Sequence, residues 1–339
     1  MRPPRTATIS KALPAVLVLL LAGAGARAQQ VPDAASLLDA VLEAPTVPYR
    51  GRLIVTQWYG KRTHAEEISV FVLPPERVRR EFLSPDGSVA RVAVSDGQRE
   101  SVRFVRSGRT FVADAAATDE SAADSEHAAL LSNYDLIAST GEKVAGRATW
   151  RLTLRPKMRG KSWQTLWLDR DTRVVLRSRR FLPHRRFASQ EQFVSFEPRA
   201  KLSESLFEVE PASGAPRAAA PAPHPLTLAE VNSPGRPPLP AALPGGFVFQ
   251  NAEAFLIGKR PVRHATYTDG LTVISLFQTD RPVRLPKDGI IPTGEMQLPG
   301  PMRASRAGKL IQWRAGPVHY TLMGDVSREL LADIVKSLR

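Results

Sequence analysis

Residues 144–196 decide the fold of this chain and read VAGRATWRLTLRPKMRGKSWQTLWLDRDTRVVLRSRRFLPHRRFASQEQFVSF. Near the start Trp150, Leu152 and Leu154 alternate with polar residues, which is the period-2 pattern of a strand with one buried face. The Asp-Arg-Asp-Thr at 169–172 is typical of a turn. Three further strand-like runs follow the first, at 163–168, 174–181 and 190–196. The block therefore predicts a four-stranded antiparallel meander, which buries one face and leaves the other in water.

Similar short runs precede this block. Between residues 50 and 113 they recur about every 8–12 residues with turn residues between them, which is typical of an all-β sheet or an open barrel. An amphipathic helix is predicted over 33–44, with Asp33 as its N-cap. A second helix over 127–138 is expected to cover the concave face of the sheet. The predicted class is therefore α+β and mainly β, with an antiparallel sheet or an open barrel in the N-terminal part.

The second half of the chain is separated from the first by a segment rich in proline and alanine. That composition cannot bury a core and favours an extended connector, within which 226–231 is expected to dock locally. Strand patterns then return, and a capped helix over 327–338 ends the chain. We predict a first domain at 29–210, a linker at 211–240 and a smaller C-terminal domain at 241–339.

The first 28 residues have the pattern of a secretory signal peptide. Basic residues precede an apolar run at 12–22, and Ala26-Arg27-Ala28 provides an A-x-A cleavage site before Gln29. The apolar run is shorter than the ~20 residues that a membrane-spanning helix needs. We therefore predict export to a periplasm and cleavage after Ala28. The chain contains no cysteine, so it has no lipid attachment site, disulfide or thiolate metal site.

The net charge points to anionic partners. It is +14 for the whole chain, and removal of 1–28 takes away four basic residues and no acid, which leaves +10. An exported protein is not expected to meet nucleic acid, so anionic headgroups, lipopolysaccharide or an acidic protein segment are the expected partners. Simple solubility explains the same charge, and both interpretations stay open.

The sequence contains no recognisable catalytic or metal-binding motif. The six histidines do not form a zinc helix, and no nucleophile elbow, phosphate-binding loop or dinucleotide fingerprint is present. We therefore predict a protein that is not an enzyme and has no cofactor or metal.

Two groups of side chains are candidates for binding. A basic run is expected either to dock phosphates and acidic partners or to be a solvated strand face and turn. Its members are Arg177, Arg179, Arg180, Arg185 and Arg186. Tryptophans on predicted strands are expected either to fill the core or to line a cavity for acyl chains. These are Trp58, Trp150, Trp163 and Trp167.

The chain resembles the MucB/RseB family of periplasmic sigma-E regulators in three places. LLDAVLEAPTVPYRGRLIV, with Tyr49 and Gly51, is similar to the opening helix and first strand of the family. VAGR, TLWLD and EQFVSF within 144–196 are similar to the end of its N-terminal domain, which is itself LolA/LolB-like. HATYTDGLTVISLF at 264–277, with GDVSRELLADIVKSL, is similar to its C-terminal domain.

This resemblance implies an N-terminal unclosed β-barrel with helices in its mouth and a smaller C-terminal α+β domain. It also implies a function as a negative regulator that binds the periplasmic part of a membrane anti-sigma factor and shields it from proteolysis. Lipid, lipopolysaccharide or an acylated lipoprotein would be sensed in the half-barrel. A LolA-like carrier of lipoproteins or lipids and an envelope protein without ligand are the alternatives, and the oligomeric state is left open.

Overall fold

The computed structural model describes residues 30–59, 62–114, 120–183, 186–211, 213, 224–232, 237–257, 260–281 and 309–338. The predicted signal peptide lies outside these residues. Within them, no helix is both long and apolar enough to cross a membrane.

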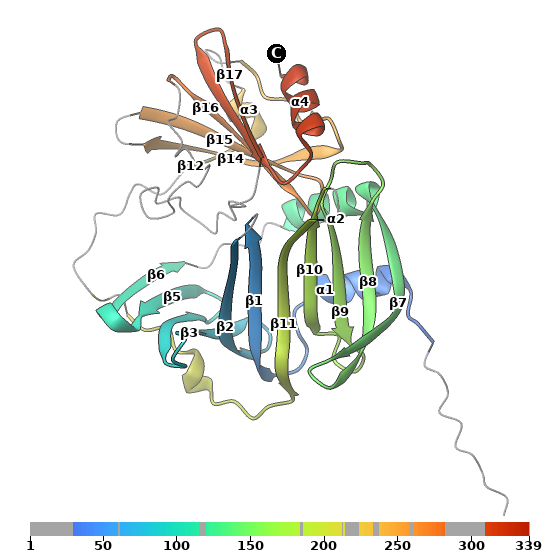
Figure 1. Cartoon of the computed structure of the whole chain (residues 1–339). Helices are drawn as coiled ribbons and strands as arrows, with labels where there is room; N and C mark the ends of the chain where they lie inside the picture. Colours follow the sequence, from blue (N-terminus) through green and yellow to red (C-terminus); the bar gives the residue numbers. More distant parts are fainter. Residues whose placement is uncertain are drawn as a thin grey trace, which may run out of the picture. The chain divides into compact units, whose positions relative to one another are not determined.

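The first sheet is antiparallel and has eleven strands in the order β6-β5-β4-β3-β2-β1-β11-β10-β9-β8-β7 (Figure 1). Strands β1 and β11 pair in its middle, and β6 and β7 lie at opposite ends of this order, so the sheet is not closed. This confirms the predicted unclosed antiparallel architecture. The strands are β1 (Tyr49–Tyr59), β2 (Arg62–Leu73), β3 (Arg77–Leu83), β4 (Val89–Ser95), β5 (Arg99–Phe104), β6 (Arg109–Asp114), β7 (Tyr134–Val144), β8 (Arg147–Pro156), β9 (Trp163–Asp169), β10 (Val175–Leu182) and β11 (Arg186–Pro198).

The four runs predicted from residues 144–196 are strands β8 to β11, and neighbouring strands pair antiparallel. In β8 the expected alternation is present: Trp150, Leu152 and Leu154 are buried, whereas Arg151 and Arg155 are exposed. These three buried side chains form one hydrophobic cluster with Leu166 and Leu168 of β9.

Two helices cover this buried face. Helix α1 (Ala34–Leu42) is capped by Asp33, which accepts hydrogen bonds from the amides of residues 35 and 36, and it lies across β7 to β9 in Figure 1. It buries Leu37 and Leu38 against the cluster, to which Leu130 of α2 (Glu120–Asn133) also belongs.

The prediction of a helix over 127–138 is wrong in its second half, because α2 ends at Asn133 and β7 begins at Tyr134. Tyr134, Leu136 and Ala138 alternate along the strand and pack against the cluster under the helices. That burial favours a strand there, although the local sequence also suits a helix.

The second sheet is built by the rest of the chain, in the order β12-β14-β15-β16-β18-β17, with β13 beside β14. Its core is a large apolar cluster against which α4 packs, and Leu226 and Val231 dock there as predicted. The domain boundaries at 210 and 240 stay predictions. The elements are β12 (His224–Leu226), α3 (Leu228–Val231), β13 (Ala242–Leu243), β14 (Phe247–Ile257), β15 (Arg260–Thr268), β16 (Val273–Thr279), β17 (Lys309–Ala315), β18 (Val318–Gly324) and α4 (Arg328–Ser337).

Candidate functional site

A basic and aromatic group lies on β9 and β10. The strand register places Trp167 opposite Arg177, and the guanidinium carbons of Arg177 and Arg179 lie 5.0 and 5.2 Å from the centre of the Trp167 ring. Both distances allow cation–π attraction. The fold therefore brings two of the five candidate arginines onto one of the four candidate tryptophans.

Glu142 on β7 neutralises part of this group. It accepts hydrogen bonds from Trp167 Nε1 at 2.7 Å and from Arg177 Nη1, whose residue is 8% exposed. Slight burial acts to raise the pKa of Glu142. The hydrogen bonds from its own backbone, Trp167 and Arg177 together outweigh that effect and hold the pKa below its ordinary value. Arg177 is therefore part of an ion pair within the sheet.

Arg179 is less well compensated than Arg177. Its Nε donates to Gln190 Oε1 at 2.6 Å, and among the described residues it makes no ion pair with a carboxylate. Burial, and after it the positive charge of Arg177, lowers the pKa of the Arg179 guanidinium. Arg179 is therefore a candidate of the group whose charge has no carboxylate partner among the described residues.

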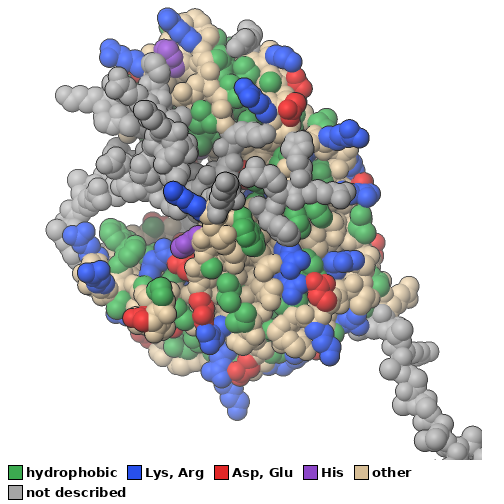
Figure 2. Space-filling model, viewed as in Figure 1, with side chains coloured by type: hydrophobic (Ala, Val, Ile, Leu, Met, Phe, Trp, Pro, Cys, Tyr) green, Lys and Arg blue, Asp and Glu red, His purple; other side chains and the backbone are tan. Residues whose placement is uncertain are grey.

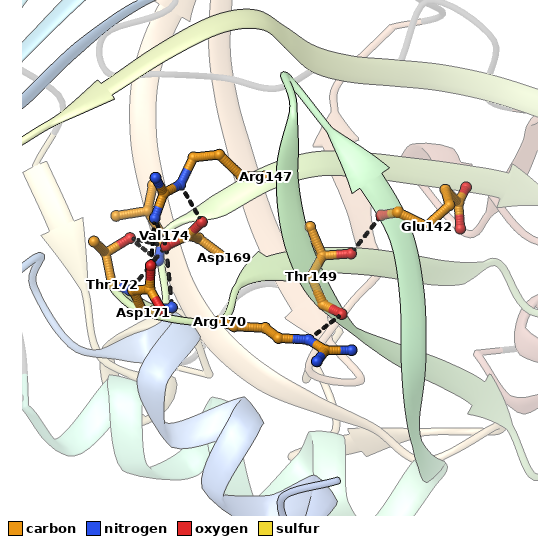
Figure 3. Close-up of polar contacts among 8 residues, drawn as sticks. All are labelled: Glu142, Arg147, Thr149, Asp169, Arg170, Asp171, Thr172 and Val174. Atoms are coloured by element: carbon orange, nitrogen blue, oxygen red, sulfur yellow. Dashed lines mark hydrogen bonds and ion pairs between the residues drawn. The ribbon is translucent and has the colours of Figure 1, made fainter. Parts of the chain in front are cut away.

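The turn between β9 and β10 stabilises this region (Figure 3). Asp169 Oδ1 accepts hydrogen bonds from the amides of Asp171 and Thr172 at 3.1 and 2.9 Å, and Oδ2 pairs with Arg147. Burial alone would raise the pKa of Asp169, but the Arg147 and Thr172 hydrogen bonds outweigh it and lower the pKa. The predicted turn at 169–172 is therefore closed by a buried, ionised carboxylate.

The remaining candidate residues lie apart from this group. Trp150 is fully buried under α1, with the Arg170 guanidinium carbon 4.0 Å from its ring centre. Trp163 stacks on Phe181 at 4.0 Å, and Arg180 faces Asp325 of the second sheet at 3.6 Å. Trp58 is half-buried on β1. Arg185 and the side chain of Arg186 lie outside the described residues. The cavity-lining and anion-binding roles stay predictions.

An apolar surface on β3 to β6 was not predicted from the sequence. Residues directly opposite each other on paired strands share a face, and the register sets Phe82 opposite Arg91 and Arg91 opposite Phe104. Phe104 and Phe111 are 41% and 49% exposed and meet edge to face at 6.0 Å. We call Phe82, Phe104 and Phe111 the phenylalanine row.

The other face of these strands is covered. Val92 and Val94 are buried there against Phe207 of the short helix Glu204–Phe207, together with residues that follow β11. The face that carries Phe104 and Phe111 is thus the exposed one, whereas Phe82 is half-buried, with the Arg91 guanidinium carbon 3.6 Å from its ring centre. The sequence signal for it was the pair Phe104 and Phe111 on either side of the Ser107-Gly108 turn, which the strand register places on one face. Among the described residues, no group of three or more acidic or histidine side chains could hold a metal.

The fold defines a class of protein: an unclosed antiparallel half-barrel followed by a second, smaller sheet with its own core. Residues 44–211 match the profile of the MucB/RseB N-terminal domain, so the chain belongs to the MucB/RseB family.

Two solved structures have a similar fold. A crystal structure of MucB in complex with MucA(peri) has a TM-score of 0.53 and 19% identity, over 89% of this chain and 97% of that chain. The MucA/MucB complex of Pseudomonas aeruginosa has a TM-score of 0.55 and 21% identity over the same shares. The likeness thus spans both sheets. No curated protein sequence matches the chain.

Proposed function

We propose that this chain is an exported, periplasmic negative regulator of an envelope-stress sigma-factor pathway. In this proposal, signal cleavage releases it into the periplasm, where it binds the periplasmic part of a membrane anti-sigma factor and shields that part from proteolysis. The family match over 44–211 carries the proposal. The structures of MucB with MucA support it, because their similarity covers the second sheet as well as the first.

We further propose that the half-barrel senses lipid or lipopolysaccharide. The phenylalanine row offers exposed apolar surface to acyl chains, and apolar contact of this kind is worth about 25 cal/mol per Å² buried. Arg179 offers a positive charge without a carboxylate partner among the described residues to a phosphate. The strand register places Arg179 and the phenylalanine row on opposite faces of the sheet, so they are two separate candidate surfaces.

A LolA-like carrier of lipoproteins or lipids is the second candidate. The open phenylalanine row favours it, because a carrier must receive acyl chains on an accessible face. A minimal carrier needs only the half-barrel, however, and the second sheet with its own core is the feature that favours a regulator.

Titration of the purified mature protein with the periplasmic segment of its cognate anti-sigma factor tests the regulator. We expect saturable binding, slower cleavage of the segment by the stress protease, and displacement of the segment by lipid A. Inorganic phosphate is the control for charge without acyl chains and should not displace the segment. Absence of binding, together with release of lipoprotein from inner membranes by the same protein, would favour the carrier.

A further inference from the structure

The turn between β15 and β16 reaches the first sheet. Asp269 within it is fully buried, and its Oδ1 closes the turn by accepting hydrogen bonds from the amides of Leu271 and Thr272 at 3.1 and 2.7 Å. Its Oδ2 faces the first sheet, where it accepts a hydrogen bond from the Tyr134 hydroxyl at 2.9 Å and forms an ion pair with Lys161 Nζ at 3.1 Å. One carboxylate thus shapes a turn of the second sheet and binds two residues of the first.

The next two residues of the turn fit against the first sheet sterically. Gly270 has φ +91°, and a Cβ placed there would lie 2.4 Å from the Leu130 Cα and N. Backbone atoms cannot move aside as a flexible side chain does, so only glycine is accommodated. Leu271 packs against the cluster that Leu37 and Leu130 form under the helices. The turn therefore contributes to the core of the first sheet.

The C-terminal end of α2 is held by the same turn. Asn133, the last residue of the helix, donates from Nδ2 to the carbonyls of Ala129 at 2.7 Å, Gly246 at 3.0 Å and Asp269 at 3.4 Å. Its Oδ1 accepts from Lys161 Nζ at 2.8 Å. Carbonyls at a helix end need partners outside the helix, and Asn133 bonds the helix and the second sheet at once.

The contact between the turn and the first sheet contains a buried ion pair, and exposing only one of its two charges is costly. The side chains of Lys161 and Asp269 are both 0% exposed, and removing one partner from such a pair leaves an uncompensated buried charge. Burial, and after it the charge of Asp269, raises the pKa of Tyr134, so its hydroxyl keeps the proton that it donates. Breaking this ion pair therefore leaves a buried charge without its partner on each side of the contact.

We propose that the turn at 268–271 is a plug seated on the end of α2, and that α2 and the second sheet open and close together. Gly270 lies against the backbone of Leu130, so α2 cannot leave its position over the first sheet unless the turn withdraws. Withdrawal of the turn also removes the bond from Asn133 to the Asp269 carbonyl. If an occupant of the half-barrel displaced α2, that displacement would thus move the turn of the second sheet as well. The coupling itself does not depend on the proposed function.

Hydrogen–deuterium exchange of the mature full-length protein tests the plug with the substitution Gly270→Ala. We expect amides 128–134, at the end of α2 and the start of β7, to exchange about tenfold faster or more, because the Cβ forces the turn away from Leu130. The matched control is Gly316→Ala. Gly316 also has a positive φ, +58°, in a turn of the same sheet, but nothing lies within 4 Å of its Cβ position, so amides 128–134 should exchange as in the wild type.

Lys161→Met tests the same coupling in the opposite direction and serves if Gly270→Ala does not fold. It changes the first sheet, and we expect faster exchange at 268–272 in the second, whereas Lys143→Met at an exposed site should have no such effect. The plug is refuted if each substitution loosens only its own sheet, or if Gly316→Ala loosens 128–134 as much as Gly270→Ala does.

Discussion

Two aspartates in this chain close turns with the same hydrogen bonds, but their ion pairs connect different parts of the molecule. Asp169 in DRDT and Asp269 in DGLT each accept hydrogen bonds from the amides two and three residues further on. Each also takes a basic partner on the other carboxylate oxygen, Arg147 in the first case and Lys161 in the second. The first ion pair stays within one sheet, whereas the second joins two sheets.

His264 is a residue whose environment makes stability depend on pH. Its imidazole is 4% exposed and stacks on Phe277 at 4.3 Å, and burial lowers its pKa from 6.5 to about 4. Because the pKa in the folded state lies below that in the unfolded state, the unfolded chain binds the proton first. The corresponding stability is present above pH 6.5 and is lost as the pH falls towards 4.

The variant His264→Gln should remove this dependence. We expect the difference in free energy of unfolding between wild type and variant to change by about 2 kcal/mol from pH 7 to pH 5. Chemical denaturation at the two pH values measures it, and His64→Gln at an exposed site is the control. Glu253 lies opposite His264 and has its pKa raised by burial, so its own protonation offsets part of the acid loss in both proteins. A difference that does not vary with pH would contradict the prediction.

At the scale of the element, the β5–β6 hairpin carries the open apolar surface. Strand alternation predicted both strands, but it could not show that Phe104 and Phe111 stay exposed, because burial depends on what packs over each face. The opposite face is covered by residues that are distant in sequence, near Phe207. The extent of α2 was missed for a similar reason, since the strand from Tyr134 is stabilised by packing under α1 and α2.

If the phenylalanine row binds acyl chains, serine substitutions in the hairpin should weaken that binding. Phe104→Ser with Phe111→Ser is expected to reduce the affinity for a fluorescently labelled acylated peptide about tenfold or more, since burial of one phenylalanine contributes about 1.5–3 kcal/mol. Val273→Ser, at an exposed apolar site 44% accessible on the second sheet, is the control. Equal affinities for all three proteins would remove the hairpin from the lipid site.

At the scale of the whole molecule, positive charge is spread rather than gathered on the face that Figure 2 shows, where Lys and Arg lie among Asp and Glu. The exposed arginines include members of ion pairs, such as Arg50 with Glu197. The net charge of +10 for residues 29–339 therefore acts mainly through long-range attraction, which salt screens over about 10 Å at 0.1 M.

Association with vesicles containing phosphatidylglycerol should follow this screening. We expect it to weaken at least about tenfold between 20 and 150 mM NaCl in a flotation assay, with neutral phosphatidylcholine vesicles as the control. Arg179→Ser removes one charge and should change the association little. Binding that is insensitive to salt would indicate apolar insertion, and a large loss with Arg179→Ser would locate the binding at that residue.

The sequence by itself determined the strands of residues 144–196, the turn at 169–172, the helix capped by Asp33, the C-terminal helix, and the membership of the MucB/RseB family. These features depend on periodicity, capping and turn chemistry, which act over a few residues. Only the tertiary structure decided that Trp150 lies in the core, that Arg177 pairs with Glu142, and that the turn at 268–271 contacts α2. Such outcomes depend on which distant segments come into contact, and neither the type of a residue nor its spacing from its neighbours shows this.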